Sequence, residues 1–153
     1  MSQVNFEQIY FRNTASLQEF RELAIDISHR LTPKSVVALK GPLGAGKTEF
    51  VRAIAQSRGF EGMASPTFAI HHRYQGFSIS IEHLDLYRLE SEEELEGVGF
   101  WDFFSETEGL IFIEWPERMD LSHIPWDWDL FEVDIAVVNA NERRVVLSRR
   151  AQE

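Results

Sequence analysis

Two short, uninterrupted apolar runs indicate strands near the centre of the fold. The first is Val36–Leu39, which leads directly into Gly41, and the second is Leu110–Ile113. Apolar runs of this length, flanked by polar or turn-forming residues, are typical of strands that are buried on both faces of a sheet. We therefore predict two fully buried strands.

Apolar residues three or four positions apart predict two longer helices. Ser16–Glu19 has the capping-box pattern that begins a helix. The apolar face expected of that helix is made by Leu17, Phe20, Ala24, Ile27 and Leu31. A second helix is predicted over Thr48–Arg58, and Gly59 is expected to end it.

Alternating and β-branched segments predict an edge strand and two hairpins. Phe6–Arg12 has the pattern of a short edge strand. One hairpin joins Thr67–Tyr74 to Phe77–His83, and the other joins Leu130–Val138 to Arg144–Leu147. We expect these hairpins to add an antiparallel part to the sheet.

Two short helices are expected between the hairpins. Ser91–Glu94 is a second capping box, and it should open an acidic helix. The aromatic run Phe100–Phe104 is interpreted as a short helix that packs against the core.

Length and composition predict one globular domain over residues 1–153. The chain has 153 residues, of which 44% are hydrophobic and 26% are charged, and this balance is typical of a folded domain. It contains no cysteine, which excludes disulfides and thiolate metal sites and fits a reducing cytoplasm. No targeting pattern or bilayer-length apolar stretch is present, so we expect a cytoplasmic protein without a membrane contact.

Negative charge is concentrated in one stretch of the chain. The formal net charge is −10, which argues against binding of nucleic acid by bulk electrostatics. Residues 82–120 hold 13 acidic side chains and two arginines, and the rest of the chain is close to neutral. This stretch is either a solvated face or a docking face for a basic partner.

The chain contains the phosphate-binding loop pattern, in the order Gly41-Pro42-Leu43-Gly44-Ala45-Gly46-Lys47-Thr48. Its glycines let backbone N–H groups curl around phosphate oxygens. Lys47 adds a positive charge at the terminal phosphates, and the Thr48 hydroxyl offers a ligand for Mg²⁺ at a helix N-terminus. The pattern lies between a predicted buried strand and a predicted helix, which is the context that it requires.

A phosphate loop needs a further acid to hold the metal or its water. Glu114 directly follows a predicted buried strand and fits that role, and Asp85 is the competing candidate. Both acids could contribute, one to Mg²⁺ and the other to the attacking water. Of the five histidines, only His83 lies close to one of these acids in sequence, and the others are interpreted as packing or surface residues.

The nucleotide is predicted to be ATP, because the chain has neither the Asn/Thr-Lys-x-Asp pattern for guanine nor the Asp-x-x-Gly pattern of a GTPase switch. The fold class that follows is α/β: a P-loop NTPase fold with a mainly parallel central sheet, antiparallel hairpins and helices on both faces.

Four motifs, in this order and spacing, resemble the TsaE (YjeE) family of bacterial P-loop ATPases. They are Gly41–Thr48, Ser65–Phe68, His83–Leu89 and Ile113–Glu117. The resemblance implies an ATPase that supports formation of threonylcarbamoyladenosine on tRNA. Its implied partners are the TsaB and TsaD subunits of the transferase complex, with tRNA contacted mainly through those partners.

The same resemblance implies roles for individual residues. Lys47 is similar to the phosphate lysine of the family, Thr48 and Glu114 to its Mg²⁺ ligands, and Asp85 to an acid that acts in catalysis or positions water. Thr67 resembles a switch threonine near the terminal phosphate.

Further nucleotide contacts follow from the resemblance alone. Trp115 matches a tryptophan beside the metal acid, although a tryptophan there could equally belong to the core. Thr14, with Asn13, and one of Arg143 and Arg144 occupy places where the family contacts nucleotide. Pro42 departs from the family, which commonly has Asp there, and proline has no N–H for phosphate.

Two other functions remain open from the sequence. A small-molecule P-loop kinase would have a similar size and loop, but it should carry an arginine-rich lid, and residues 97–125 contain only Arg118. A nucleotide-dependent binding module would hold ATP and change partners without turnover.

Overall fold

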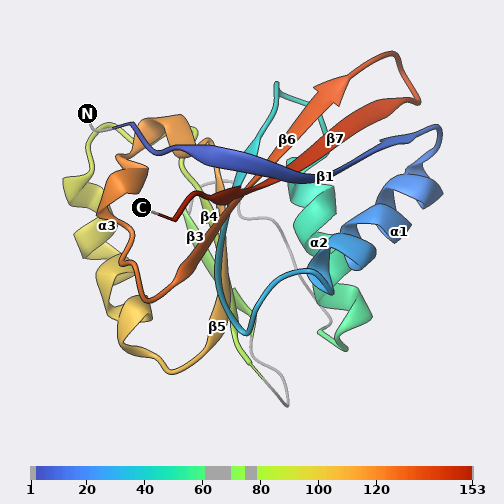
Figure 1. Ribbon diagram of the computed structural model, residues 1–153. Coiled ribbons are helices and arrows are strands. Elements are labelled where there is room, and N and C mark those ends of the chain that lie inside the picture. Colours follow the sequence, from blue (N-terminus) through green and yellow to red (C-terminus); the bar gives the residue numbers. More distant parts are fainter. Residues whose placement is uncertain (1–2, 61–69, 75–78, 153) are drawn as a thin grey trace.

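The computed structural model describes residues 3–60, 70–74 and 79–152. In these ranges the strands form one mixed sheet in the order β1-β7-β6-β2-β5-β4-β3 (Figure 1). The strands are β1 (Phe6–Thr14), β2 (Lys34–Lys40), β3 (His71–Tyr74), β4 (Ile81–Asp85), β5 (Gly109–Glu114), β6 (Asp129–Val137) and β7 (Arg143–Arg150).

The centre of the sheet is parallel and its margins are antiparallel. Strand β2 pairs in parallel with both β5 and β6, and β5 pairs in parallel with β4. Strands β1, β7 and β3 pair antiparallel with their neighbours. Because the carboxyl ends of parallel strands meet at one edge, Leu39, Asp85 and Glu114 lie together in register there.

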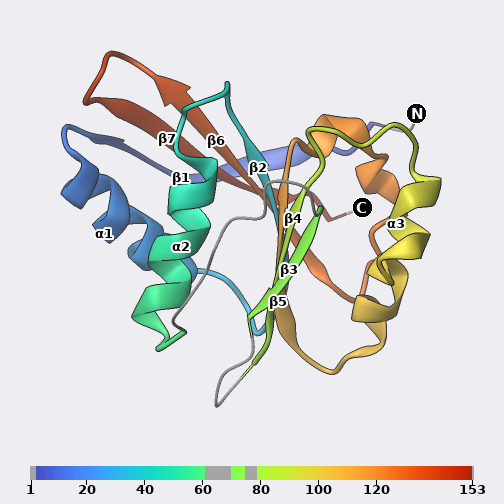
Figure 2. The ribbon, with the colours of Figure 1, turned by 180° about the vertical axis from the view of Figure 1, so that it is seen from behind.

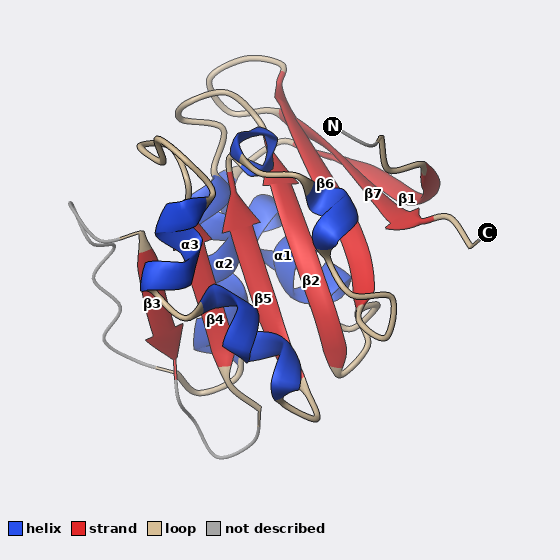
Figure 3. Cartoon of the chain, turned by 90° about the vertical axis from the view of Figure 1, so that its left-hand side faces the viewer, coloured by secondary structure: helices blue, strands red, loops and turns tan. Residues whose placement is uncertain are grey.

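Helices cover the two faces of the sheet. Helices α1 (Leu17–Ser28) and α2 (Lys47–Ser57) lie on one face (Figures 1 and 2). The other face is covered by α3 (Glu93–Gly97) and by short 3-10 helices that include η1 (Phe100–Ser105), η2 (Pro116–Arg118) and η3 (Leu121–His123), as Figure 3 shows. This arrangement confirms the predicted α/β fold class with helices on both faces.

Each face has its own hydrophobic core. Phe50, Ile54 and Phe112 belong to the core under α1 and α2. Leu95, Phe100 and Ile111 belong to the core under α3 and η1. Since successive residues of β5 face opposite sides, the strand is buried along its whole length, as its apolar run predicts.

The first predicted helix is confirmed, with one error in its apolar face. Ser16 is the N-cap of α1, and its hydroxyl accepts a hydrogen bond from the Glu19 N–H at 3.1 Å. Phe20, Ala24 and Ile27 are buried, as predicted. Leu17, however, is 54% exposed, because the first turn of α1 borders a cavity beside the glycine-rich loop and not the core.

The second capping box is wrong in its detail. The predicted acidic helix is present as α3, but it begins at Glu93, and its N-cap is Glu92, which has helical backbone angles and makes no side-chain capping hydrogen bond. The Glu94 carboxylate instead accepts from the N–H of Glu90 at 3.1 Å.

The two hairpins differ in how far the described residues test them. Strands β6 and β7 confirm the C-terminal hairpin. Strands β3 and β4 confirm antiparallel pairing for the other one, of which residues 67–69 and 75–78 lie outside the described residues. No helix in the described ranges has the length and apolar character needed to cross a membrane.

Candidate functional site

A glycine-rich loop, Gly41–Gly46, connects the carboxyl end of β2 to the N-terminus of α2. Gly46 has a φ of 114°, and a Cβ there would lie 2.9 Å from the Phe20 ring. At Gly41 a Cβ would lie 2.8 Å from the Ile135 carbonyl oxygen. Side chains at these two positions would push the loop away from α1 and β6, so its shape requires glycine.

The loop presents backbone donors at the start of α2. Within the described residues, the N–H groups of Leu43, Gly44 and Gly46 donate no hydrogen bond. Pro42 has no N–H, and its carbonyl closes a turn by accepting from Ala45 N–H at 3.0 Å. Free amides at the positive end of a helix are suited to an anion such as phosphate.

Lys47 is buried and folded across the loop. Its Nζ donates a hydrogen bond to the Gly41 carbonyl oxygen and lies 3.5 Å from the centroid of the Trp115 ring. Burial lowers the pKa of Lys47 from its usual value, and Glu114, Glu117 and Asp85 act against that shift. The ammonium group therefore lies near the predicted acids, as a phosphate-binding lysine requires.

Glu114 is buried at the carboxyl end of β5 and meets the first turn of α2. Its Oε2 accepts a hydrogen bond from the Thr48 hydroxyl at 2.9 Å. The same oxygen lies 2.5 Å from His83 Nε2. The two residues predicted as metal ligands are thus in direct contact, although 66 positions separate them in the chain.

Asp85 lies beside Glu114 but is more accessible. It ends β4, pairs in register with Glu114 and is half-buried. Its Oδ1 accepts a hydrogen bond from the Tyr87 N–H at 3.0 Å. Register partners on parallel strands point to the same face, so both carboxylates face α2 and the glycine-rich loop.

The donor set of this site fits Mg²⁺ better than a metal that needs many protein ligands. A threonine hydroxyl and a glutamate carboxylate are hard oxygen donors, and Mg²⁺ is commonly bound by one or two carboxylates together with substrate phosphates. Among the described residues, no group of three or more His, Asp or Glu side chains could hold a metal by itself.

The structure distinguishes the two arginines that the sequence left open. Arg143 Nε donates to the Ala45 carbonyl at 2.9 Å, and its Nη2 lies 3.4 Å from the Gly44 carbonyl. Arg144 instead reaches the Asn13 side chain at 3.4 Å. Arg143 is therefore the one that supports the glycine-rich loop.

A cavity of about 360 Å³ adjoins the loop on the α1 side. Its walls include Leu17, Gly44, Gly46, Asn141 and Arg143. Thr14 is not part of these walls. It is buried in register with Arg143 at the end of β1, and its hydroxyl has no hydrogen-bond partner among the described residues.

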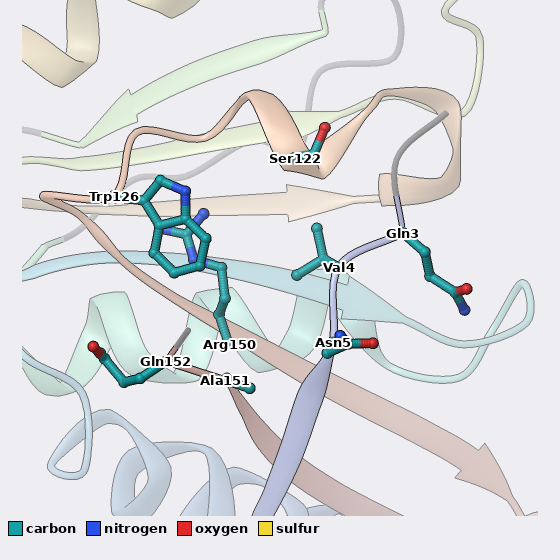
Figure 4. Close-up of a pocket in the computed structure, with 8 residues that line it drawn as sticks. All are labelled: Gln3, Val4, Asn5, Ser122, Trp126, Arg150, Ala151 and Gln152. Carbon is teal, nitrogen blue, oxygen red and sulfur yellow. The ribbon is translucent and has the colours of Figure 1, made fainter.

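A second cavity, of about 220 Å³, is lined by residues 3–5, by Ser122 and Trp126, and by residues 150–152 at the end of β7 (Figure 4). The Trp126 ring covers the Arg150 guanidinium there, at 4.0 Å. Arg150 donates to the carbonyls of Ile124, Pro125 and Trp128 at 2.9 to 3.0 Å. Because the Arg150 guanidinium already donates to these backbone carbonyls, it is less available to a ligand than the backbone donors of the glycine-rich loop.

Most of the predicted site residues therefore come together at one edge of the sheet. Thr48 and Glu114 are in direct contact, Lys47 lies on the Trp115 ring, and Asp85 pairs in register with Glu114. Thr67 lies outside the described residues. The contact of His83 with Glu114 was not predicted from the sequence. The signal that could have indicated it is the position of His83, two residues before Asp85 on the same strand.

The fold and the loop define the class first: this is a P-loop NTPase-like protein. Among solved structures, the crystal structure of Bacillus subtilis YdiB superposes on this chain with a TM-score of 0.71 and 22% sequence identity. The superposition covers 97% of this chain and 90% of YdiB. At this identity the likeness concerns the fold alone.

The sequence comparisons then give the family. The family model described as "Threonylcarbamoyl adenosine biosynthesis protein TsaE" matches residues 14–146. A TsaE protein of Rickettsia felis is 38% identical over 128 residues, covering 82% of this chain and 72% of its own length. One from Aquifex aeolicus is 32% identical over 138 residues, covering 88% and 92%. The chain belongs to the TsaE family of tRNA threonylcarbamoyladenosine biosynthesis proteins.

Proposed function

We propose that residues 1–153 form one ATPase domain that hydrolyses ATP with Mg²⁺ to support threonylcarbamoyl transfer to adenosine of tRNA by a TsaB–TsaD complex. The observation that carries the proposal is the contact of Thr48 with Glu114 beneath the glycine-rich loop. A hydroxyl and a carboxylate brought together at a helix N-terminus, next to a lysine, match the needs of a metal-bound triphosphate.

The loop and Lys47 would hold the phosphates. The free N–H groups of the loop and the N-terminus of α2 attract phosphate oxygens. Lys47 would exchange the Gly41 carbonyl for a terminal phosphate oxygen, which is a stronger acceptor for a cation. Its contact with the Trp115 ring keeps the ammonium group close to that position.

Thr48 and Glu114 would hold Mg²⁺, either directly or through its water. The Thr48 hydroxyl donates a hydrogen bond to Glu114, so the lone pairs of the Thr48 oxygen can bind a metal. Bound Mg²⁺ supplies charge stabilisation for the phosphoryl oxygens.

Asp85 is the residue we assign to the attacking water. It faces the same side as Glu114, is more accessible, and uses only Oδ1 in its hydrogen bond to Tyr87. Its second oxygen has no hydrogen bond within the described residues and could orient a water by accepting a hydrogen bond from it. Thr67 remains a candidate contact of the terminal phosphate, because it resembles the switch threonine of the family.

The base and ribose would use the cavity next to the loop. The cavity volume of about 360 Å³ lies within the range of small-molecule sites. Leu17 offers an apolar wall and Asn141 polar groups. We place Thr14 and Arg143 in support of this site, since they pair in register beside it.

The proposal extends to partners and location. We assign recognition of tRNA mainly to the TsaB–TsaD partners, because the net charge of −10 opposes direct binding of a polyanion. A cytoplasmic location follows from the same role.

A reconstituted tRNA modification assay with TsaB, TsaD and ATP tests the proposal. Lys47→Ala and Glu114→Ala should each abolish modification and ATP hydrolysis, because they remove the phosphate charge and the metal ligand. Lys34→Ala is the matched control, since Lys34 lies at the other end of β2 and pairs with Asp127 at 2.9 Å.

The assay also separates the alternatives. Normal modification by the Lys47 and Glu114 variants would refute the site. Full cycling with a non-hydrolysable ATP analogue would favour a binding module, and a phosphorylated metabolite would favour a kinase.

A further inference from the structure

His83 is a buried histidine in contact with the candidate metal ligand. It lies on β4 with only 3% of its surface exposed. Its Nε2 is 2.5 Å from Glu114 Oε2, the oxygen that also accepts from Thr48. Two side chains from different elements therefore hold the same carboxylate oxygen.

The chemistry of the pair decides where the histidine proton lies. A metal-binding glutamate is ionised and can only accept hydrogen bonds. His83 Nε2 must then carry the proton and act as the donor. With both donors on Oε2, the other oxygen of Glu114 has no hydrogen bond within the described part of the chain, and it remains available to the metal.

Packing alone does not account for a histidine at this position. Its second nitrogen, Nδ1, is buried without a partner among the described residues, and so is Nε2 of the neighbouring His72. An unpaired buried polar atom costs stability. An apolar side chain would fill the space beside Phe112, the register partner of His83, without that cost.

We propose that His83 is a positioning residue that holds the Glu114 carboxylate in place for Mg²⁺ through its Nε2–H donor. This inference rests on the proposed function, because it assigns His83 a role toward the metal of that same site. Partners that orient metal ligands commonly change metal affinity by about 10- to 100-fold when they are removed. His83 acts through Glu114 and does not touch the nucleotide in this assignment.

His71 provides a matched control on the opposite face of the sheet. It also contacts a buried glutamate, Glu82, which is paired with Arg73 as well. Its ring packs on Phe103, 5.0 Å away, in the core under η1. The His71–Glu82 pair therefore has similar chemistry but no access to the glycine-rich loop.

The test compares two substitutions that differ in reach. In His83→Gln the amide nitrogen can take the place of Nε2, whereas in His83→Asn the amide is too short to reach Glu114. Affinity for ATP is measured by calorimetry with Mg²⁺ and with EDTA, so turnover is not needed. We expect the Mg²⁺-dependent gain in affinity to fall about tenfold or more in His83→Asn, and to be largely kept in His83→Gln and His71→Gln.

A double-mutant cycle checks that His83 acts through the carboxylate. In a Glu114→Gln background, His83→Asn should cause little further loss of Mg²⁺-dependent affinity, because the group that it positions is already gone. Independent, additive losses would overturn the inference.

Two outcomes separate this inference from the proposed function. If the wild-type protein does not bind ATP, the proposed function fails. If wild-type binds ATP with Mg²⁺ but His83→Asn does so equally, or if the Gln and Asn variants lose affinity equally, the positioning role is refuted and the proposed function stands.

Nitrogen chemical shifts of the wild-type protein give a test that needs no variant. A long-range ¹H–¹⁵N spectrum distinguishes protonated from unprotonated imidazole nitrogens. We expect His83 Nε2 to be protonated, and an unprotonated Nε2 would overturn the inference even if His83→Asn failed to fold.

Discussion

At the scale of the residue, an unusual backbone conformation lies directly after β5. Trp115 has a φ of 58°, and it is the only non-glycine residue with positive φ in the described ranges. This conformation costs about 1 to 2 kcal/mol for a residue with a Cβ. Contacts with Tyr87, at 5.0 Å between ring centroids, and with Lys47 hold the ring there. Strain kept at such a place is typical of functional sites.

The pKa of Lys47 leads to a prediction about pH. Burial lowers this pKa below its usual value of 10.5, so the free protein loses the lysine charge at a lower pH than an exposed lysine would. Affinity for ATP should be level below the lowered pKa and should fall as the pH rises through it, since only the ammonium form binds phosphate strongly.

The matching variant is Lys47→Arg, whose guanidinium keeps its charge. It should bind ATP with little change over the same alkaline range, whatever its overall affinity, as measured by calorimetry. A wild-type affinity that stayed level up to pH 10.5 would contradict the prediction.

At the scale of the element, the β6–β7 hairpin supports a loop from another part of the chain. Arg143 at the start of β7 donates to the carbonyls of Ala45 and Gly44, and also to those of Asn139 and Glu142 at the hairpin turn. One side chain thus connects the turn to the glycine-rich loop, 98 residues away in sequence for Ala45. The hairpin contributes to loop shape without lying next to the loop in the sequence.

Arg143→Ala should therefore weaken binding of ATP by about tenfold, because hydrogen bonds from a charged donor contribute about 1.5 to 3 kcal/mol. Arg144→Ala is the control, since the Arg144 side chain reaches Asn13 and, among the described residues, makes no hydrogen bond to the glycine-rich loop. Calorimetry of both variants checks the difference. Equal losses would mean that the charge of the hairpin matters and not the contact with the loop.

At the scale of the whole molecule, the negative charge has several different roles. Glu82 is buried with Arg73 and His71, and Glu114 is buried at the candidate site. Glu92 accepts a hydrogen bond from the Asp120 N–H. Exposed acids remain around α3, within η1 and directly after it, and they are Glu90, Glu93, Glu94, Glu96, Asp102, Glu106 and Glu108. These seven acids are the acidic face.

The acidic face is the surface that we expect to meet a basic region of a partner. Glu93→Lys combined with Glu96→Lys should weaken binding to a TsaB–TsaD complex about tenfold at low salt, and less at high salt because ions screen exposed charges. Glu92 is left intact, since its carboxylate holds the backbone at Asp120.

The matched control is Glu7→Lys combined with Glu22→Lys, which makes the same charge change on exposed residues of β1 and α1. Binding of both double variants is measured by surface plasmon resonance over a series of salt concentrations. Equal effects of the two pairs would point to net charge, and no effect of either would leave the acidic face a solvated surface.

How much of this could be predicted from sequence depends on how local each feature is. The buried strands, α1, α2 and the C-terminal hairpin follow from hydrophobic spacing and were predicted within a few residues. Capping at Ser91 was predicted wrongly, because the box pattern does not reveal that Glu92 is already helical. The exposure of Leu17 was missed, because only its neighbours in space decide which side of the first turn is covered.

The sequence by itself determined the glycine-rich loop, its lysine and its threonine, because those residues are contiguous and their conformations follow from local backbone chemistry. Tertiary structure decided which distant side chains join them. Glu114 meets Thr48 because β5 lies next to β2, and it meets His83 because β4 lies next to β5. Strand order and register fix these contacts, and both depend on how the two cores close over the sheet, which no local pattern encodes.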